Sequence, residues 1–217
     1  MQHAIAQIKS LTLDSSKPVL VTDADEVLLD FADIFSRYLT SRDLYMSYES
    51  YALSGNIRQK KTDIPLPREE ISPLLDDFFD YSVDQQELVP GVKANLDALS
   101  DHCQIVILTN LPHNFADRRR ALFQRHDIHH PLVTNSGPKG PAVREISATM
   151  NQPLVFVDDI SHHITSVAEN VPESFRLQYV AHETLDRITE QAADSHHRCD
   201  DWDHIRELVM RHIGDLK

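Results

Sequence analysis

The stretch VLVTDADEVLLD, residues 19–30, decides the fold of this chain. The residues VLVT run directly into Asp23, and a second acidic residue, Asp25, follows two positions later. A continuous apolar run of this kind predicts a strand that is buried on both faces, as strands of parallel sheets are. Residues two apart on an extended segment point to the same side, so we expect both carboxylates to face one pocket.

Three further apolar runs end in polar residues in the same way. They are IVIL (105–108) before Thr109, LV (132–133) before Thr134 and LVFV (154–157) before Asp158. Segments with helix-compatible apolar spacing lie around them, at residues 92–100, 114–126, 141–150 and 164–170. This alternation predicts an α/β fold with a doubly wound parallel sheet. Residues 175–181 predict a further strand, and residues 202–216 predict a closing helix with Trp202 on its core face.

Residues 32–88 separate the first predicted strand from the second by far more than a crossover helix requires. FADIFSRYLTSRD (31–43) and REEISPLLDDFFDY (68–81) predict helices, and SGNIRQKKTDIPLP (54–67) predicts a loop. We therefore expect an α/β core made of residues 1–31 and 89–217, with a small helical cap domain inserted at 32–88.

The composition favours a soluble globular protein. The chain has 217 residues, of which 41% are hydrophobic and 25% charged, and it has no apolar run long enough for a membrane span. A net charge of −13 repels phosphate backbones, so we expect no nucleic-acid-binding surface. The lack of a spanning apolar run predicts no membrane partner. We find no secretory signal and therefore expect a cytoplasmic location. The two cysteines are too few for a disulfide framework. The sequence carries no signal of oligomeric state.

Ligands of a doubly wound sheet bind beyond the carboxyl ends of its strands, so the residues that follow each apolar run share one rim. That rim collects Asp23, Asp25, Thr109, Lys139, Asp158 and Asp159. Phosphoryl transfer needs an in-line nucleophile, positive charge for the phosphate oxygens and a proton for the leaving group. The rim offers a candidate for each of these functions.

Four segments along this rim resemble the motifs of the haloacid dehalogenase superfamily, in the order that the family has them. VLVTDADEVLLD is similar to the first motif, ILTN (107–110) to the second, the lysine of SGPKGP (136–141) to the third and VFVDD (155–159) to the fourth. One such motif alone is weak, but four in order at strand ends are specific. The resemblance implies a Rossmann-like core and a Mg²⁺-dependent phosphohydrolase that acts on small phosphorylated metabolites or nucleotides.

The resemblance also implies how the reaction would proceed. Asp23 would attack phosphorus and form an aspartyl-phosphate, and Asp25 would protonate the leaving oxygen and then take a proton from water. Thr109, Asn110 and Lys139 would bind the phosphate group of the substrate. Because the dehalogenases of the family lack a carboxylate at the position of Asp25, we expect a phosphatase instead.

The resemblance implies a Mg²⁺ ion held by Asp23, the backbone carbonyl of Asp25, and Asp158. Asp159 would orient Lys139 or a metal-bound water. One position departs from the family pattern, since Glu26-Val27 stands where many members have Gly-Thr. The turn after the nucleophile therefore lacks the conformational freedom of glycine.

Other interpretations stay open at this point. The chain could be a binding or regulatory domain with weak or no catalysis, or a phosphotransferase of the same family. A phospho-receiver domain also uses Asp, Thr and Lys around magnesium, but Lys139 precedes Asp158-Asp159 here, against the order that receivers have.

Charged clusters elsewhere in the sequence give weaker indications. Arg58, Lys60 and Lys61 form a basic patch in the predicted cap that could recognise an anionic substrate, although a solvated loop is the more common explanation. We assign no function to the run 118–120, RRR. A zinc site is disfavoured because no standard ligand spacing repeats among its candidates, which are His196, His197, Cys199 and His204.

Overall fold

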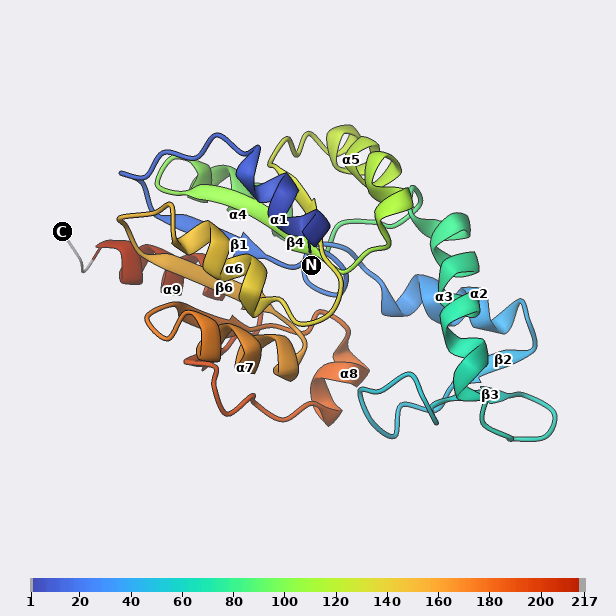
Figure 1. Cartoon of the computed structure of the whole chain (residues 1–217). Coiled ribbons are helices and arrows are strands. Elements are labelled where there is room, and N and C mark those ends of the chain that lie inside the picture. The colour runs from blue at the N-terminus through green and yellow to red at the C-terminus, as the bar shows by residue number, and fades with distance from the viewer. Residues whose placement is uncertain (1, 215–217) are drawn as a thin grey trace.

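A six-stranded parallel sheet forms the centre of the molecule, in a computed structural model that describes residues 2–214 (Figure 1). The strand order is β5-β4-β1-β6-β7-β8, and every neighbouring pair is parallel. The predicted doubly wound sheet is therefore confirmed. The strands are β1 Val19–Thr22, β4 Gln104–Thr109, β5 Leu132–Thr134, β6 Leu154–Asp158, β7 Phe175–Gln178 and β8 His197–Arg198.

Helices cover both faces of the sheet, and this explains why the strands are apolar at every position. Leu20 packs into the cluster of buried side chains on one face, whereas its neighbours Val19 and Val21 pack into the cluster on the other. The first face is covered by α4 Val92–Ser100, α5 Ala116–Arg125 and α9 Trp202–Gly214. The second is covered by α1 Gln2–Lys9, α6 Gly140–Ser147 and α7 Ser161–Asn170.

The elements outside the motifs match the expectations in part. The predicted strand at 175–181 is β7, and the predicted closing helix is α9, with Trp202 fully buried and residues 215–216 outside the described part. The predicted helix at 114–126 is a short 3-10 helix, η1 His113–Phe115, followed by α5. The sequence did not predict α1, α8 Glu183–Ile188 or β8. No helix within residues 2–214 has the length and apolar character that crossing a membrane requires.

The inserted segment (residues 32–88) contains both predicted helices, α2 Ala32–Thr40 and α3 Arg68–Ser82, and projects from one end of the sheet (Figure 1). The predicted helical cap also contains a small antiparallel sheet, which β2 Leu44–Met46 and β3 Ile57–Gln59 form. The loop predicted at 54–67 therefore contains a strand. Residues of the segment pack around their own cluster, in which the rings of Phe35 and Phe78 lie 4.8 Å apart, and Leu111 and Phe115 of the core join this cluster.

Candidate active site

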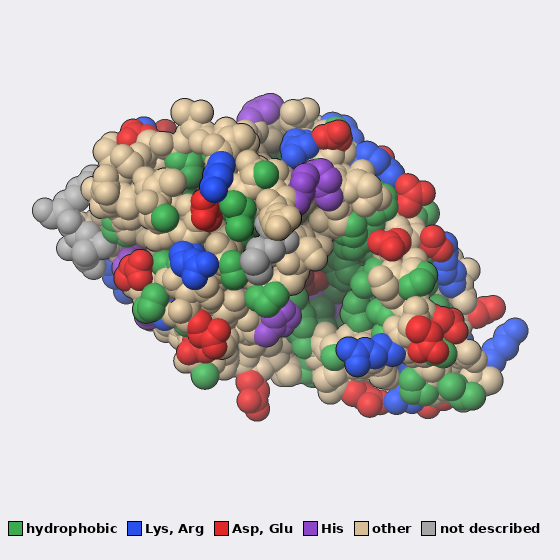
Figure 2. Space-filling model, in the orientation of Figure 1, with side chains coloured by type: hydrophobic (Ala, Val, Ile, Leu, Met, Phe, Trp, Pro, Cys, Tyr) green, Lys and Arg blue, Asp and Glu red, His purple; other side chains and the backbone are tan. Residues whose placement is uncertain are grey.

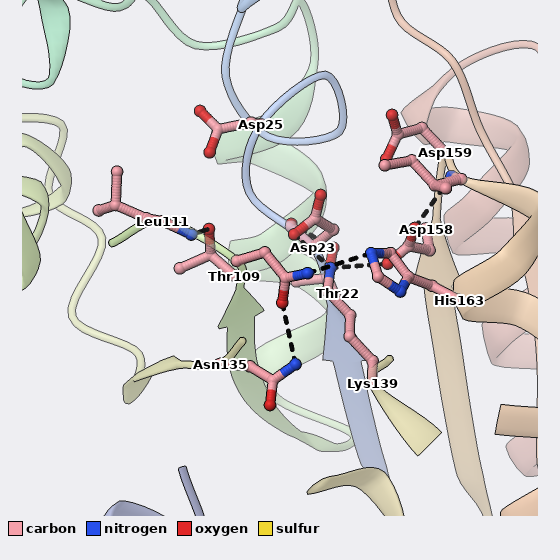
Figure 3. Close-up of polar contacts among 12 residues, drawn as sticks. Thr22, Asp23, Asp25, Thr109, Leu111, Asn135, Lys139, Asp158, Asp159 and His163 are labelled. Carbon is pink, nitrogen blue, oxygen red and sulfur yellow. Dashed lines mark hydrogen bonds and ion pairs between the residues drawn. The ribbon is translucent and has the colours of Figure 1, made fainter. Parts of the chain in front are cut away.

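Three charged side chains meet at the carboxyl edge of the sheet. Asp23 directly follows β1 and Asp158 ends β6, and these adjacent strands run in parallel, so both carboxylates emerge at the same edge. The Nζ atom of Lys139 lies 2.5 Å from Asp23 Oδ1 and 2.7 Å from Asp158 Oδ2 (Figure 3). All three residues are buried. The structure thus brings together three of the residues that the sequence predicted for the site.

Lys139 is positioned by close packing between α6 and α7. Gly140, the first residue of α6, donates its backbone N–H to Ser166 Oγ at 3.1 Å. A Cβ atom on Gly140 would lie only 2.0 Å from the backbone oxygen of Ser166, so a larger residue could not fit without displacement of one helix. In SGPKGP, the lysine supplies the charge of the site, and the glycine that follows allows the helices to pack closely enough to position it.

Asp159 completes the acidic cluster and also contacts the inserted segment. Its Oδ2 accepts a hydrogen bond from the hydroxyl of Tyr51, which comes from the loop between β2 and β3. Its Oδ1 is buried and has no hydrogen-bond partner among the residues that the structure describes. A buried acceptor without a partner is uncommon and calls for a ligand or a proton. No sequence pattern indicated Tyr51, because none of the four motifs includes or positions that loop.

Burial controls the ionisation of this cluster. It raises the pKa of Asp23 to about 7, with Lys139 opposing the shift and Asp158 adding to it. Burial also raises the pKa of Asp159 well above its ordinary value, and the charges of Asp158 and Asp23 raise it further. For Lys139, burial acts to lower the pKa, but Asp158 and Asp23 outweigh that effect, so the pKa is raised and the ammonium stays charged. The cluster thus holds three carboxyl groups and one cation, which pairs with Asp23 and Asp158.

The same carboxylates fit a divalent metal ion. Asp23, Asp158 and Asp159 each offer a carboxylate oxygen, and these oxygens lie within 4.8 Å of one another. Carboxylate oxygens are the ligands that hard cations such as Mg²⁺ prefer. A bound cation would also satisfy Asp159 Oδ1 and offset the excess negative charge. Within residues 2–214 this is the one group of at least three His, Cys, Asp or Glu side chains that could hold a metal ion. The zinc candidates His196, His197, Cys199 and His204 do not form such a group.

Asp25 lies in the same cavity, but its carboxylate points away from Asp23 (Figure 3). Asp25 Oδ1 accepts hydrogen bonds from Arg119 Nη1 and from Gln86 Nε2, both at 3.0 Å. Arg119 Nη2 in turn donates to Gln86 Oε1 at 2.6 Å. The side chain of Arg119 is 0% exposed and that of Asp25 is 18% exposed, so this is a largely buried ion pair.

Arg119 belongs to the run 118–120, to which we assigned no function, although its position on the helix indicated one. Arg119 precedes Leu122 and Phe123 by three and four residues, so it lies on the buried face of α5. Its neighbours Arg118 and Arg120 are 38% and 40% exposed and pair with aspartates at the surface. An arginine on an apolar helix face requires a buried acidic partner, and Asp25 is that partner.

Thr109 and Asn110, the predicted phosphate ligands after β4, also line the cavity. Thr109 Oγ1 accepts the backbone N–H of Leu111 at 3.1 Å and keeps its own hydroxyl proton as a donor. The Asn110 side chain donates to the carbonyl of Gly137 at 3.0 Å and accepts from Asn135 at 2.9 Å. These bonds brace the loop that leads to Lys139. Phosphate binding by Thr109 and Asn110 stays a prediction.

Glu26 occupies the turn position where the sequence analysis noted the missing glycine. Its φ of +65° is in the left-handed region, which glycine adopts most easily. The carboxylate of Glu26 accepts the backbone N–H of Ala32 at 2.9 Å and that of His182 at 2.7 Å. Burial raises the pKa of Glu26 to about 8, with these two bonds opposing the shift. The side chain thus ties the turn to α2 and to the start of α8, which offsets the cost of the backbone conformation.

A cavity of about 750 Å³ opens between the core and the inserted segment. Asp23, Thr109, Lys139 and Asp159 line it on the core side. Figure 2 shows the recess, whose visible wall consists mainly of hydrophobic side chains. The basic patch of the sequence analysis does not line this cavity. Arg58 instead pairs with Glu49 at 3.6 Å and Asp63 at 3.5 Å.

Solved structures share this architecture over most of the chain. A haloacid dehalogenase-like protein of unknown function from Agrobacterium tumefaciens has 16% identity and a TM-score of 0.65, and the match covers 91% of this chain and 99% of that one. A haloacid dehalogenase-like hydrolase from Streptococcus pneumoniae has 12% identity, a TM-score of 0.60 and coverages of 90% and 99%. A HAD family hydrolase from Deinococcus radiodurans with bound phosphate and sodium has 13% identity, a TM-score of 0.59 and coverages of 91% and 97%.

No protein-family model matches the sequence, and no curated protein matches it significantly. The likeness is therefore one of fold, at sequence identities too low to transfer an activity. The chain has the haloacid dehalogenase fold, a parallel α/β core with a segment inserted after its first strand. The resemblance drawn from the four motifs is confirmed at this level.

Proposed function

We propose that this protein is a Mg²⁺-dependent phosphohydrolase that cleaves small phosphate monoesters through an aspartyl-phosphate on Asp23. The observation that carries the proposal is the buried cluster in which Lys139 Nζ lies within 2.7 Å of both Asp23 and Asp158, beside Asp159. A nucleophile, a fixed cation and further oxygen ligands at one point are what phosphoryl transfer requires. The haloacid dehalogenase fold and the phosphate bound by its relative from Deinococcus radiodurans support the proposal.

Each residue of the site has a proposed role in forming or hydrolysing the aspartyl-phosphate. Asp23 attacks phosphorus with a carboxylate oxygen, while the bond from phosphorus to the ester oxygen breaks and the alcohol leaves. Lys139 and the hydroxyl of Thr109 offset the charge on the phosphoryl oxygens. Water then attacks the aspartyl-phosphate, which releases inorganic phosphate and restores Asp23. A Mg²⁺ ion held by Asp23, Asp158 and the backbone carbonyl of Asp25 would add positive charge to the phosphate, and Asp159 would orient Lys139 or a metal-bound water.

Asp25 is proposed to move the protons in both half-reactions. It gives a proton to the departing alcohol and accepts one from the attacking water. Both of its hydrogen bonds to Arg119 and Gln86 use Oδ1, so Oδ2 is the oxygen proposed to exchange protons. The pair with Arg119 would fix the orientation of the carboxylate between the two steps.

The proposal is tested by hydrolysis of acetyl phosphate and phenyl phosphate by the wild type and by Asp23→Asn, with Mg²⁺ and with EDTA. We expect Mg²⁺-dependent turnover in the wild type and a loss of roughly 10³-fold or more in the variant, because the nucleophile is removed. Acid-quenched wild type should retain labelled phosphate, and Asp23→Asn should not. The control is Asp76→Asn, which removes an exposed carboxylate on α3 and should keep full activity. Full activity in Asp23→Asn would contradict the assignment of the nucleophile.

A further inference from the structure

The wall of the cavity above the acidic cluster is aromatic and aliphatic. Its side chains come from the residue before α2, from α2 itself, from the loop after β2 and from α3. They include Phe31, Phe35, Tyr48, Tyr51, Leu75 and Phe79. The alcohol portion of a bound phosphate ester must therefore contact apolar surface. Binding free energy there is favourable for apolar groups and unfavourable for polar groups that lose their water.

Positive charge in this cavity is confined to its base. Lys139 is the one lysine or arginine that lines it within residues 2–214, and its ammonium is already shared by Asp23 and Asp158. Burial lowers the pKa of His163 to about 4, so its ring is neutral at pH 7. His162, whose ring lies 4.0 Å from that of His163, is exposed at the rim.

The remaining charged residues of the lining are acidic. Asp25 is already paired with Arg119, and Glu26 is held by the backbone N–H groups of Ala32 and His182, so neither offers positive charge to a ligand. A substrate with a second anionic group, such as a carboxylate or another phosphate, would place that group near these acids or against apolar side chains, without a cation. Burying an unpaired charge is strongly unfavourable. The electrostatics thus oppose any anion besides the phosphate that reacts.

From these features we infer that the substrate is a phosphate monoester of an uncharged, apolar alcohol or phenol, with an aromatic ring against the inserted segment. The inference rests on the proposed function and deepens it. A cavity of about 750 Å³ is large enough for a group of more than one ring, since about 150 Å³ of apolar space holds benzene. Aromatic side chains such as Phe35 and Phe79 favour ring contacts of this kind.

The first test compares matched esters with the wild type in the presence of Mg²⁺. Phenyl phosphate and 4-carboxyphenyl phosphate differ by one carboxylate, and we expect kcat/KM to be at least about tenfold higher for phenyl phosphate because the added charge lacks a partner. In the series ethyl, butyl and hexyl phosphate, kcat/KM should rise by up to about fourfold per methylene as the chain enters the cavity. Equal or better turnover of 4-carboxyphenyl phosphate or of 2-phosphoglycolate would overturn the inference.

The second test changes the wall. Leu75→Lys places a cation on the partly buried, cavity-facing side of α3 and should raise the relative kcat/KM for 4-carboxyphenyl phosphate by about tenfold or more. Ile64→Lys is the matched control, because Ile64 is 56% exposed on the same inserted segment and does not line the cavity. The control should keep the wild-type preference. An unchanged preference in a folded Leu75→Lys protein, checked by thermal unfolding, would count against the inference.

Acetyl phosphate tests the proposed hydrolase activity separately from the proposed substrate class, because its small acyl group contacts little of the apolar wall. If acetyl phosphate is hydrolysed and Asp23→Asn abolishes this, while charged esters are preferred, then the proposed function stands and the substrate class is wrong. If neither acetyl phosphate nor any ester is hydrolysed, both proposals are wrong.

Discussion

Arg119 illustrates how a single buried charge connects stability with the proposed chemistry. Its guanidinium is 0% exposed and has two partners, the carboxylate of Asp25 and the amide of Gln86. A buried ion pair adds little net stability when complete, yet removal of one partner leaves the other charge uncompensated. Asp25 is therefore expected to support the fold in addition to moving protons.

We predict that Asp25→Asn lowers the free energy of unfolding by about 3 kcal/mol, because Arg119 loses its counter-charge. The double variant Asp25→Asn with Arg119→Met should regain part of this loss while activity stays low. Urea unfolding and kcat measure the two effects separately. Asp97→Asn is the matched control, because it breaks the exposed pair with Lys93 and should cost less than about 1 kcal/mol. A loss in Asp25→Asn as small as in this control would contradict the assignment.

Glu26 shows how one residue can replace what glycine usually provides. A non-glycine residue at φ +65° is strained, and the cost is of order 1 kcal/mol. Without this carboxylate, the buried backbone N–H of Ala32 and the partly buried one of His182 would each lose the partner that they have here. A glycine could adopt the turn but could not make these bonds. These two hydrogen bonds explain how Glu26 can stand at a turn position where glycine is common.

At the scale of elements, the close approach of α6 and α7 determines where Lys139 lies. We predict that Gly140→Ala lowers the free energy of unfolding by about 1–3 kcal/mol, because its Cβ would meet the backbone oxygen of Ser166 at 2.0 Å. The melting temperature should fall by about 2–4 °C for each kcal/mol. Gly214→Ala is the matched control, since among residues 2–214 no atom beyond its chain neighbours and its own helix backbone lies within 4 Å of a Cβ there. Equal melting temperatures for the two variants would show that the helices can separate at no cost.

The strand ends of the core were predictable from the sequence, and so were the residues that follow them. Asp23, Thr109 and Asp158 each come at the end of an apolar run, and parallel pairing brings such ends to one edge. This part of the site depends on local sequence and on a general property of parallel sheets. Its prediction did not require the fold of the inserted segment to be known.

The parts of the site that depend on the inserted segment were not predicted. Tyr51 and Gln86 contact Asp159 and Asp25 only because a chain of more than fifty residues returns to the core in a particular arrangement. The strands β2 and β3 have three residues each, too few for a recognisable periodicity. Short elements and contacts between distant segments are set by tertiary packing, which local patterns do not encode.

At the scale of the whole molecule, the core and the inserted segment enclose an excess of negative charge. The chain has a net charge of −13, and Asp23 and Asp158 share Lys139 at the base of the cavity, with the carboxyl group of Asp159 beside them. Mutual repulsion and burial oppose the ionised form of Asp23 and Asp159. A cation that binds there relieves this repulsion in the folded state and has no comparable site in the unfolded chain. Binding should therefore stabilise the entire fold.

We predict that Mg²⁺ raises the melting temperature of the wild type, because a ligand of the folded state alone adds about 2.7 kcal/mol at a concentration of 100 Kd. For a chain of this length each kcal/mol corresponds to about 2–4 °C. Differential scanning calorimetry with MgCl₂, against NaCl at equal ionic strength, measures the specific shift. Asp158→Asn removes a ligand and should abolish most of the shift, whereas Asp76→Asn, exposed on α3, should keep it. The same shift in both variants would mean that Mg²⁺ acts on the general negative charge and not at the three carboxylates.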